Sequence, residues 1–355
     1  MPDKPPPARV VFLGGLGRSG TTLLERLLGE VPGVAPLGEV VHLWARGVLA
    51  DEPCGCRRPF SACPFWREVG ERAFGGWPDD LAHRMLRLRR RVDRTRCVPE
   101  LARRLAGSPA RAGSTGPATS AASAGSSGHA ERPGLARPVT PSETVRSAEL
   151  TELAESPELA EYAAAHRRLY DAAAEVSGRP VVVDSSKHAS TAFCLAAAGL
   201  DVRVVHVVRD PRAVAHSWRR RVPRPEDGRP MTRWSPARTS LHWLAQNLSL
   251  ELLARGGAHV TRVRYEDLLD APAAVLGRLA VEAGLAPRLD FLSVGRADLS
   301  PAHTVSGNPV RFTVGPIGLD PDDGWRTAAP ARHRRLVATL TWPLMIKYGY
   351  DRRPA

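Results

Sequence analysis

The sequence predicts an α/β protein in which a central parallel β-sheet is covered by helices on both faces. Short apolar runs rich in valine recur along the chain, and each leads through glycine or polar residues into a segment of helical periodicity. These runs are continuously apolar, as is typical of strands in a parallel sheet that is buried on both faces. Such sheets bind ligands at the carboxyl ends of their strands, where we expect the functional site.

Four strands follow from this pattern, and each is followed by a helix or a helix start. The predicted strands are residues 9–14, 180–184, 202–208 and 260–263. The first runs through a glycine-rich loop into a helix that begins at Thr21. The second leads into an alanine-rich helix that ends near Gly199. The third precedes Pro211, at an early helical position where proline is favoured.

One stretch does not fit a folded domain. Residues 106–157 are rich in Gly, Ser, Ala, Thr and Pro, with no periodic large apolar residue. Burial cannot offset the ordering entropy of such a segment, so we interpret it as a disordered, low-complexity insertion. Its neighbours, residues 79–104 and 158–176, are predicted to be helices of a helical subregion beside the sheet. We take residues 8–350 as one domain that contains the insertion.

The composition limits the partners only weakly. A formal net charge of +13 favours anionic partners such as nucleic acid, anionic lipid or a phosphorylated ligand. The basic residues are scattered, without the interleaved aromatic residues of single-strand binders, so no specific nucleic acid is predicted. We find no signal peptide and no apolar stretch of about 20 residues that could span a bilayer. A cytoplasmic location is therefore expected.

The loop after the first strand is predicted to bind phosphate. It reads Gly15-Leu16-Gly17-Arg18-Ser19-Gly20-Thr21-Thr22. A glycine-rich turn at a helix start directs backbone N–H groups and the positive end of the helix dipole at an anion. Gly15 and Gly20 match the Walker A spacing, but Thr21 stands where that pattern has lysine. The loop is therefore P-loop-like yet unsuited to ATP or GTP hydrolysis, and Arg18 supplies the cation.

This loop resembles the 5'-phosphosulfate loop of sulfotransferases that use 3'-phosphoadenosine-5'-phosphosulfate (PAPS). The resemblance implies that the sulfonate and 5'-phosphate are bound by Gly17, Arg18, Ser19, Gly20, Thr21 and Thr22. It also implies that Arg209, at the end of the third strand, and Ser217, eight residues later, bind the 3'-phosphate. The chemistry agrees, because an arginine fork suits phosphate oxygens and a hydroxyl one or two helical turns on can face the same pocket.

Glu39, Lys187, Arg18 and His188 are the candidates for catalysis. The placement of Glu39 resembles that of the catalytic glutamate of tyrosylprotein sulfotransferases, which implies a general base. The alternative is a carboxylate that only complements a helix dipole. His42 and His188 are rival bases, since cytosolic sulfotransferases use a histidine and imidazole titrates near neutral pH. In related enzymes a lysine placed like Lys187 contacts the bridging oxygen of the departing nucleotide.

The C-terminal region is similar to the tail of one bacterial sulfotransferase family. The segments that carry this likeness are residues 264–268, 303–312, 325–326, 342–343 and 348–350. Arg311, in a Gly-Asn-Pro turn, is a candidate for a further 3'-phosphate contact.

Cys54, Cys56 and Cys63 lie close together in the sequence. With His83 they could bind zinc, but the C-x-C spacing lacks the usual gap of two to four residues and no second pair exists. A local disulfide or buried free thiols are favoured instead. No metal is predicted, and sulfonate transfer requires none.

Together these features predict a sulfotransferase that moves a sulfonate from PAPS to a hydroxyl, or in second place an amine, and releases PAP. The mechanism is in-line displacement with general-base assistance, and the acceptor is a small molecule, a peptide or a glycan. Two alternatives stay open. One is a P-loop-like nucleotide kinase, against which the missing lysine counts. The other is a non-catalytic protein that binds phosphate or nucleic acid.

Overall fold

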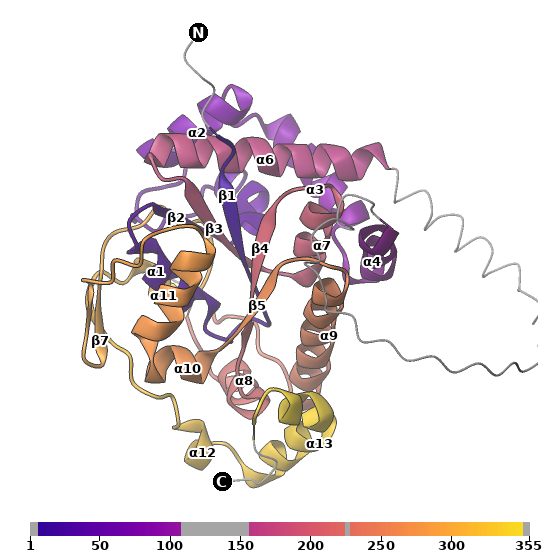
Figure 1. Cartoon of the computed structure of the whole chain (residues 1–355), viewed down its shortest axis with the longest axis vertical. Coiled ribbons are helices and arrows are strands. Elements are labelled where there is room, and N and C mark those ends of the chain that lie inside the picture. The colour runs from indigo at the N-terminus through magenta and orange to yellow at the C-terminus, as the bar shows by residue number, and fades with distance from the viewer. Residues whose placement is uncertain (1–5, 108–155, 224–227, 351–355) are drawn as a thin grey trace, which may run out of the picture.

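The computed structural model describes residues 6–107, 156–223 and 228–350 (Figure 1). Its central sheet has five parallel strands in the order β2-β3-β1-β4-β5. They are β1 (Arg9–Gly14), β2 (Val34–Gly38), β3 (Val181–Lys187), β4 (Val202–Val208) and β5 (Val260–Arg264). The predicted fold class is confirmed. The sequence pattern missed β2 because Pro36 interrupts it, and proline is tolerated there because β2 is an edge strand.

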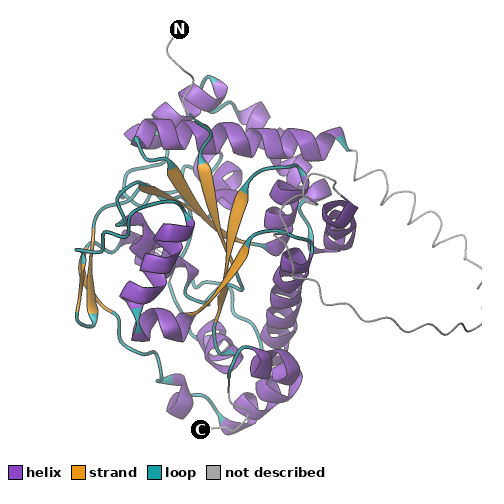
Figure 2. Ribbon diagram, in the orientation of Figure 1, coloured by secondary structure: helices purple, strands orange, loops and turns teal. Residues whose placement is uncertain are grey.

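The helices cover both faces of the sheet (Figure 2). The principal ones are α1 (Thr21–Gly29), α2 (Pro64–Phe74), α3 (Asp79–Val92), α4 (Val98–Gly107), α6 (Pro157–Ser177), α7 (Ala189–Ala197), α8 (Pro211–Arg219), α9 (Pro236–Arg255), α10 (Tyr265–Asp270), α11 (Pro272–Glu282), α12 (Trp325–Ala328) and α13 (Ala331–Lys347). Short helical turns are η1 (Val40–His42), η2 (Leu43–Val48), η3 (Thr95–Cys97) and η5 (Pro309–Phe312). Several helices begin as the sequence indicates, because the side chains of Ser156, Asp210 and Ser235 cap helices whose next residue is proline.

The two faces of β1 show how the core is divided. Successive side chains of a strand point to opposite faces. Val10 and Phe12 pack into a cluster with α2, α3, α4, α6, α7 and α9. Val11 and Leu13 pack on the other face with α1, α10 and α11. A sheet buried on both sides explains why its strands read as continuous apolar runs.

The helical subregion differs in detail from the prediction. The single helix predicted over 79–104 is two helices, α3 and α4, joined by the turn η3. Asp93 ends α3, and its buried carboxylate accepts hydrogen bonds from the hydroxyls of Tyr162 (2.9 Å) and Thr191 (2.7 Å). Helix α4 continues to Gly107 and α6 begins at Pro157, so the insertion is slightly shorter than predicted. The rest of it lies outside the described residues.

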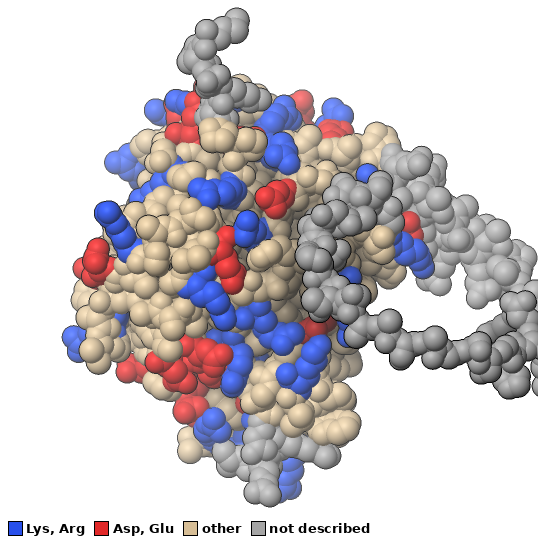
Figure 3. Space-filling model, viewed as in Figure 1, with Lys and Arg blue, Asp and Glu red and all other residues tan. Residues whose placement is uncertain are grey.

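A small antiparallel sheet, which the sequence pattern did not indicate, packs beside α1. Its strands are β6 (Leu292–Ser293), β7 (Arg296–Leu299) and β8 (Gly315–Gly318), in the order β6-β7-β8. Within the described ranges, no helix combines the length and apolar character needed to cross a bilayer. Figure 3 shows Lys and Arg spread over much of the visible face with Asp and Glu among them.

Candidate active site

A cavity of about 800 Å³ opens at the carboxyl ends of the sheet strands. Every strand contributes to its wall through the residues that follow it. These are the loop 15–18 and 20–23 after β1, Glu39 after β2, Lys187 and His188 at the end of β3, Arg209 after β4 and Tyr265 after β5. Most of the predicted site residues are therefore in one place, where ligands of parallel sheets are expected.

The backbone of the phosphate loop is held in a shape that requires glycine at two positions. Gly15 has φ of 151°, and a Cβ there would lie 2.4 Å from the carbonyl oxygen of Val207. Gly20 has φ of 92°, and its Cβ would overlap the ring of Tyr265. Arg18, between them, adopts φ of 75°, which is uncommon for a residue with a side chain. Backbone strain of this kind is concentrated at functional sites.

The Arg18 side chain lies near an aromatic ring, a thioether sulfur and a second guanidinium group. Its guanidinium lies 5.8 Å from the ring centroid of Trp218 and contacts the sulfur of Met231 at 3.1 Å. Burial and the nearby charge of Arg220 lower the pKa of Arg18, although Glu39 opposes this effect. Two mutually repelling guanidinium groups at the same cavity favour the binding of an anion.

The hydroxyl residues of the loop differ in position. Thr21 and Thr22 begin α1 and line the cavity, as does Gly17. Ser19 is buried and does not line the cavity, and its backbone N–H donates to the carbonyl of Leu16 at 3.1 Å.

Glu39 and Lys187 form an ion pair inside the cavity. The ammonium donates directly to Oε1 of the carboxylate, and both side chains are largely buried. Burial alone would raise the pKa of Glu39, but the Lys187 ammonium, the largest of the opposing influences, brings it below its usual value. Glu39 is therefore a carboxylate at neutral pH.

The two rival histidines lie beside this pair. His42 Nε2 is 3.5 Å from Glu39 Oε2, and the rings of His42 and His188 are 6.3 Å apart, edge to face. Burial lowers the pKa of His42 to about 3, despite the opposing effect of Glu39. Burial also lowers the pKa of His188. Both imidazoles and the Glu39 carboxylate are thus unprotonated at neutral pH, so each of the three can accept a proton there.

The backbone of Lys187 is tied to the phosphate loop. Its carbonyl accepts hydrogen bonds from the N–H of Gly15 at 3.1 Å and from the amide of Gln246 at 2.5 Å. Like Arg18, Lys187 has a left-handed backbone, with φ of 71°. These bonds fix the residue at which β3 leaves the sheet, so the ammonium is positioned relative to the loop.

Arg209 and Ser217 line the same cavity, from the end of β4 and from α8. The guanidinium of Arg209 lies over the ring of Tyr265, 4.4 Å from its centroid. It donates to the carbonyl of Arg18 at 3.0 Å and to the carboxylate of Asp322 at 2.5 Å. Arg209 therefore links the end of β4 to the phosphate loop and already binds a carboxylate, that of Asp322. The side chain of Asp322 is half exposed.

Arg311 is placed differently from its predicted role. Its side chain is fully buried and donates to the carbonyl oxygens of Thr304 (2.9 Å) and Pro53 (2.8 Å). It is not among the residues that line the cavity, although its neighbours Pro309 and Val310 are. This geometry favours a role in folding the 304–313 segment over a contact with phosphate.

Two buried charges in α1 were not singled out from the sequence. Glu25 accepts hydrogen bonds from Gly38 N–H and from the Ser185 hydroxyl, which joins the ends of β2 and β3. Arg26 donates to the carbonyls of Arg311 (2.8 Å), Ser300 (2.5 Å) and Thr313 (3.0 Å), and so holds the C-terminal segment. The signal was present, since adjacent charges interrupt an otherwise apolar helix.

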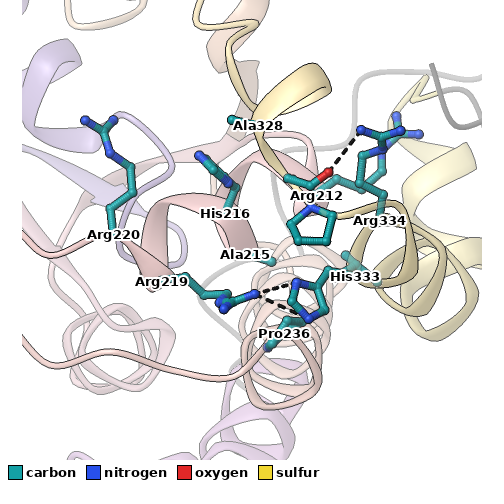
Figure 4. Close-up of a pocket in the computed structure, with 12 residues that line it drawn as sticks. Arg212, Ala215, His216, Arg219, Arg220, Pro236, Ala328, His333 and Arg334 are labelled. Carbon is teal, nitrogen blue, oxygen red and sulfur yellow. Dashed lines mark hydrogen bonds between the residues drawn. The ribbon is translucent and has the colours of Figure 1, made fainter.

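A second hollow of about 280 Å³ runs along α8 but contains no predicted site residue (Figure 4). There Arg219 donates to the ring of His333. Arg212, which also lines it, is buried, donates through two nitrogens to the carboxylate of Asp210, and packs over Trp325. These charges are used within the fold, so we place the functional site in the larger cavity.

No protein-family model matches the chain, and no curated protein sequence matches it. Two solved structures are similar to it over nearly its full length. A sulfotransferase domain from the olefin synthase of Synechococcus PCC 7002 is 20% identical, with a TM-score of 0.42, covering 99% of this chain and 98% of that one. A sulfotransferase domain from the curacin biosynthetic pathway is 14% identical, with a TM-score of 0.43, covering 98% and 99%. At this level of similarity, the activity of the chain is inferred from its own residues.

Proposed function

We propose that the chain is a sulfotransferase that moves a sulfonate group from PAPS to an acceptor hydroxyl and releases PAP. The observation that carries this proposal is that one cavity contains the phosphate loop, Arg209 with Ser217, and the Glu39–Lys187 ion pair. Two separate anion-binding groups suit a nucleotide with phosphates at both its 3' and 5' positions.

The loop binds the phosphosulfate end of the donor in this proposal. Its backbone N–H groups and the start of α1 favour the 5'-phosphate, and Arg18 lies where it can neutralise the sulfonate. Arg209 and Ser217 bind the 3'-phosphate, and the ring of Tyr265 packs against the guanidinium of Arg209. In taking the phosphate, Arg209 gives up its contact with Asp322.

Glu39 and Lys187 carry the chemistry. Glu39 accepts the proton of the acceptor hydroxyl while the acceptor oxygen forms its bond to sulfur. The bond between sulfur and the bridging oxygen breaks, and the Lys187 ammonium stabilises the negative charge that develops on the departing phosphate. Arg18 stabilises the sulfonate oxygens in the transition state. The products are a sulfate ester and PAP, and an amine acceptor would react in the same way.

Apolar and aromatic residues also line the cavity. Trp218 and Trp234 stack with ring centroids 3.8 Å apart, and Met231 and Val310 lie in the same lining. Among small-molecule, peptide and glycan acceptors, these walls favour a hydroxyl carried next to an apolar or aromatic group. A screen with radiolabelled PAPS that compares phenols, aliphatic alcohols and sugars tests this preference.

Ligand-induced stabilisation separates the proposal from a nucleotide kinase. PAP should raise the melting temperature in the presence of a chelator, whereas ADP with Mg²⁺ should have a smaller effect, because only PAP uses both anion sites. Stronger stabilisation by ADP and Mg²⁺ would favour the kinase. Binding of PAP without transfer to any acceptor class would favour a non-catalytic binding protein.

A further inference from the structure

Three cysteines and a histidine from distant parts of the chain converge outside the active site. The sulfur atoms of Cys54, Cys56 and Cys63 and a ring nitrogen of His303 all lie within 4.8 Å of one another. The thiols belong to the loop before α2, and Cys63 is the residue that precedes that helix. His303 lies some 240 residues further along the chain, at the start of the segment that reaches the active site.

Four of the six separations are close to the edges of a metal-centred tetrahedron. Sγ of Cys63 is 3.6 Å from that of Cys54 and 3.8 Å from that of Cys56. Nδ1 of His303 is 3.2 Å from the Cys63 sulfur and 3.9 Å from the Cys54 sulfur. Zinc binds thiolate at about 2.3 Å and imidazole at about 2.0 Å, which places neighbouring ligand atoms of a tetrahedral site about 3.5–3.8 Å apart. A disulfide would bring two sulfurs to about 2.05 Å.

Backbone contacts around the cluster also join the two segments. The N–H of Gly55 donates to the carbonyl of Thr304 at 2.9 Å. A Cβ on Gly55 would lie 2.5 Å from both the carbonyl oxygen of Ala302 and the hydroxyl of Thr304. The ring of His303 stacks on Phe65, with centroids 5.1 Å apart and planes inclined by 16°. The ring of His303 is therefore held in place by its stacking on Phe65, and the backbone next to it is held by the hydrogen bond from Gly55.

We propose that Cys54, Cys56, Cys63 and His303 bind a structural Zn²⁺ ion. Four protein ligands of Cys₃His type leave no open coordination position, which is the pattern of structural rather than catalytic zinc. This assignment replaces the favoured disulfide or free thiols. It also replaces His83, which is exposed on α3, where its ring nitrogen contacts the carbonyl of Asp79 at 2.7 Å. The short C-x-C spacing is compatible with zinc because the loop brings the sulfurs of Cys54 and Cys56 within 3.6 Å and 3.8 Å of that of Cys63.

The ion would act as a cross-link next to the active site. Two residues after His303, Val305 pairs with the end of β2, where it accepts from the N–H of Glu39 at 2.8 Å and donates to Leu37 at 2.8 Å. The zinc site would therefore hold the segment that positions the backbone of Glu39. The proposal does not depend on the reaction that Glu39 performs.

Metal analysis of the full chain tests the site directly. Protein purified under reducing conditions with added zinc should contain about one zinc per chain. Replacement by Co²⁺ should give thiolate-to-cobalt charge transfer and the intense visible bands of a tetrahedral site. Chelation should lower the melting temperature. Wild-type protein that takes up neither metal, or in which alkylation and mass spectrometry find a disulfide within the cluster, would overturn the proposal.

Variants identify the ligands. Cys56→Ser and His303→Ala should lose the metal, whereas His303→Cys should retain it and add a fourth thiolate to the cobalt spectrum. Cys97→Ala is the matched control, since Cys97 is a buried free cysteine outside the cluster, and it should keep the full metal content. Unchanged metal content in both Cys56→Ser and His303→Ala would exclude these residues as ligands.

Discussion

The hydroxyl of Ser185 donates a 2.8 Å hydrogen bond to one carboxylate oxygen of Glu25, whose other oxygen accepts from the N–H of Gly38 at 2.5 Å. Glu25 thereby joins the carboxyl ends of β2 and β3 from the helix that follows the phosphate loop. The next residue after Gly38 is Glu39, and Lys187 follows two residues after Ser185. The proposed base and the proposed leaving-group lysine thus share one buried support.

The first prediction concerns the effect of pH on stability. Burial raises the pKa of Glu25 to about 7, and hydrogen bonds from Ser185 and Gly38 only partly oppose this. The unfolded chain releases this proton near pH 4.5, so the contribution of Glu25 to stability is complete below that pH and is lost as pH rises through 7. Glu25→Gln should therefore gain stability relative to wild type between pH 5 and 8, by on the order of 3 kcal/mol.

Chemical denaturation of both proteins across this pH range measures the difference in their free energies of unfolding. The contributions of groups that titrate in the same way in both proteins cancel in that difference. Glutamine is a suitable substitute, because its carbonyl can accept from Gly38 while its amide donates to Ser185. Glu30→Gln, at the partly exposed end of the same helix, is the comparison variant. A difference that is flat with pH would show that Glu25 titrates normally.

Local chemistry made the core of the site predictable from the sequence. A strand, two glycines and a helix start define an anion site through backbone geometry alone, so the loop from Gly15 to Thr22 was identified without any distant residue. Arg209 and Ser217, eight residues apart, were predicted instead from their resemblance to a motif of the sulfotransferase family. The parallel sheet was predictable because burial on both faces leaves a continuous apolar pattern.

Other features depend on contacts between distant residues. Nothing near Cys54 in the sequence indicates His303, and nothing near Arg209 indicates Asp322. Arg311 lies in a turn that suggested a phosphate contact, yet its guanidinium satisfies buried carbonyls, as buried charged groups must. Pairing of this kind is decided by tertiary packing, so pattern and spacing alone did not reveal it.

The second prediction tests the base. Glu39→Gln should lower kcat by about 10²- to 10⁴-fold, because the amide cannot accept the acceptor's proton. Stabilisation by PAP should persist, since the loop and Arg209 are unchanged. His42→Gln and His188→Asn are the comparison variants and should keep most of kcat, because Glu39 is the proposed base. Steady-state kinetics with full activity in Glu39→Gln would instead assign the base to a histidine.

The third prediction concerns the second anion site. Arg209→Ala should weaken PAP binding by about 10- to 100-fold, the effect of losing charge-assisted hydrogen bonds to phosphate. Asp322→Asn should tighten binding a few-fold, because Asp322 competes for Arg209 and a half-exposed ion pair is worth less than about 1 kcal/mol. Asp323→Asn, which removes a neighbouring carboxylate paired with Arg326, should have no effect. Calorimetric titration with PAP measures all three, and weaker binding in Asp322→Asn would argue against this site.

The last prediction links the phosphate loop to Arg209 through Tyr265. A methyl group on Gly20 would lie 2.1 Å from the Tyr265 ring, on a backbone with φ of 92°, so Gly20→Ala should destabilise the fold by about 2 kcal/mol or more. The displaced ring also supports the guanidinium of Arg209, so PAP binding should weaken at the second anion site as well. In a Tyr265→Ala background the steric conflict is absent, and the same substitution should cost only the backbone strain of about 1–2 kcal/mol. Gly324→Ala is the control, because its φ is −54° and no heavy atom lies within 4 Å of the added methyl. Equal costs of Gly20→Ala in the two backgrounds, measured by denaturation, would show that the ring does not restrict the loop.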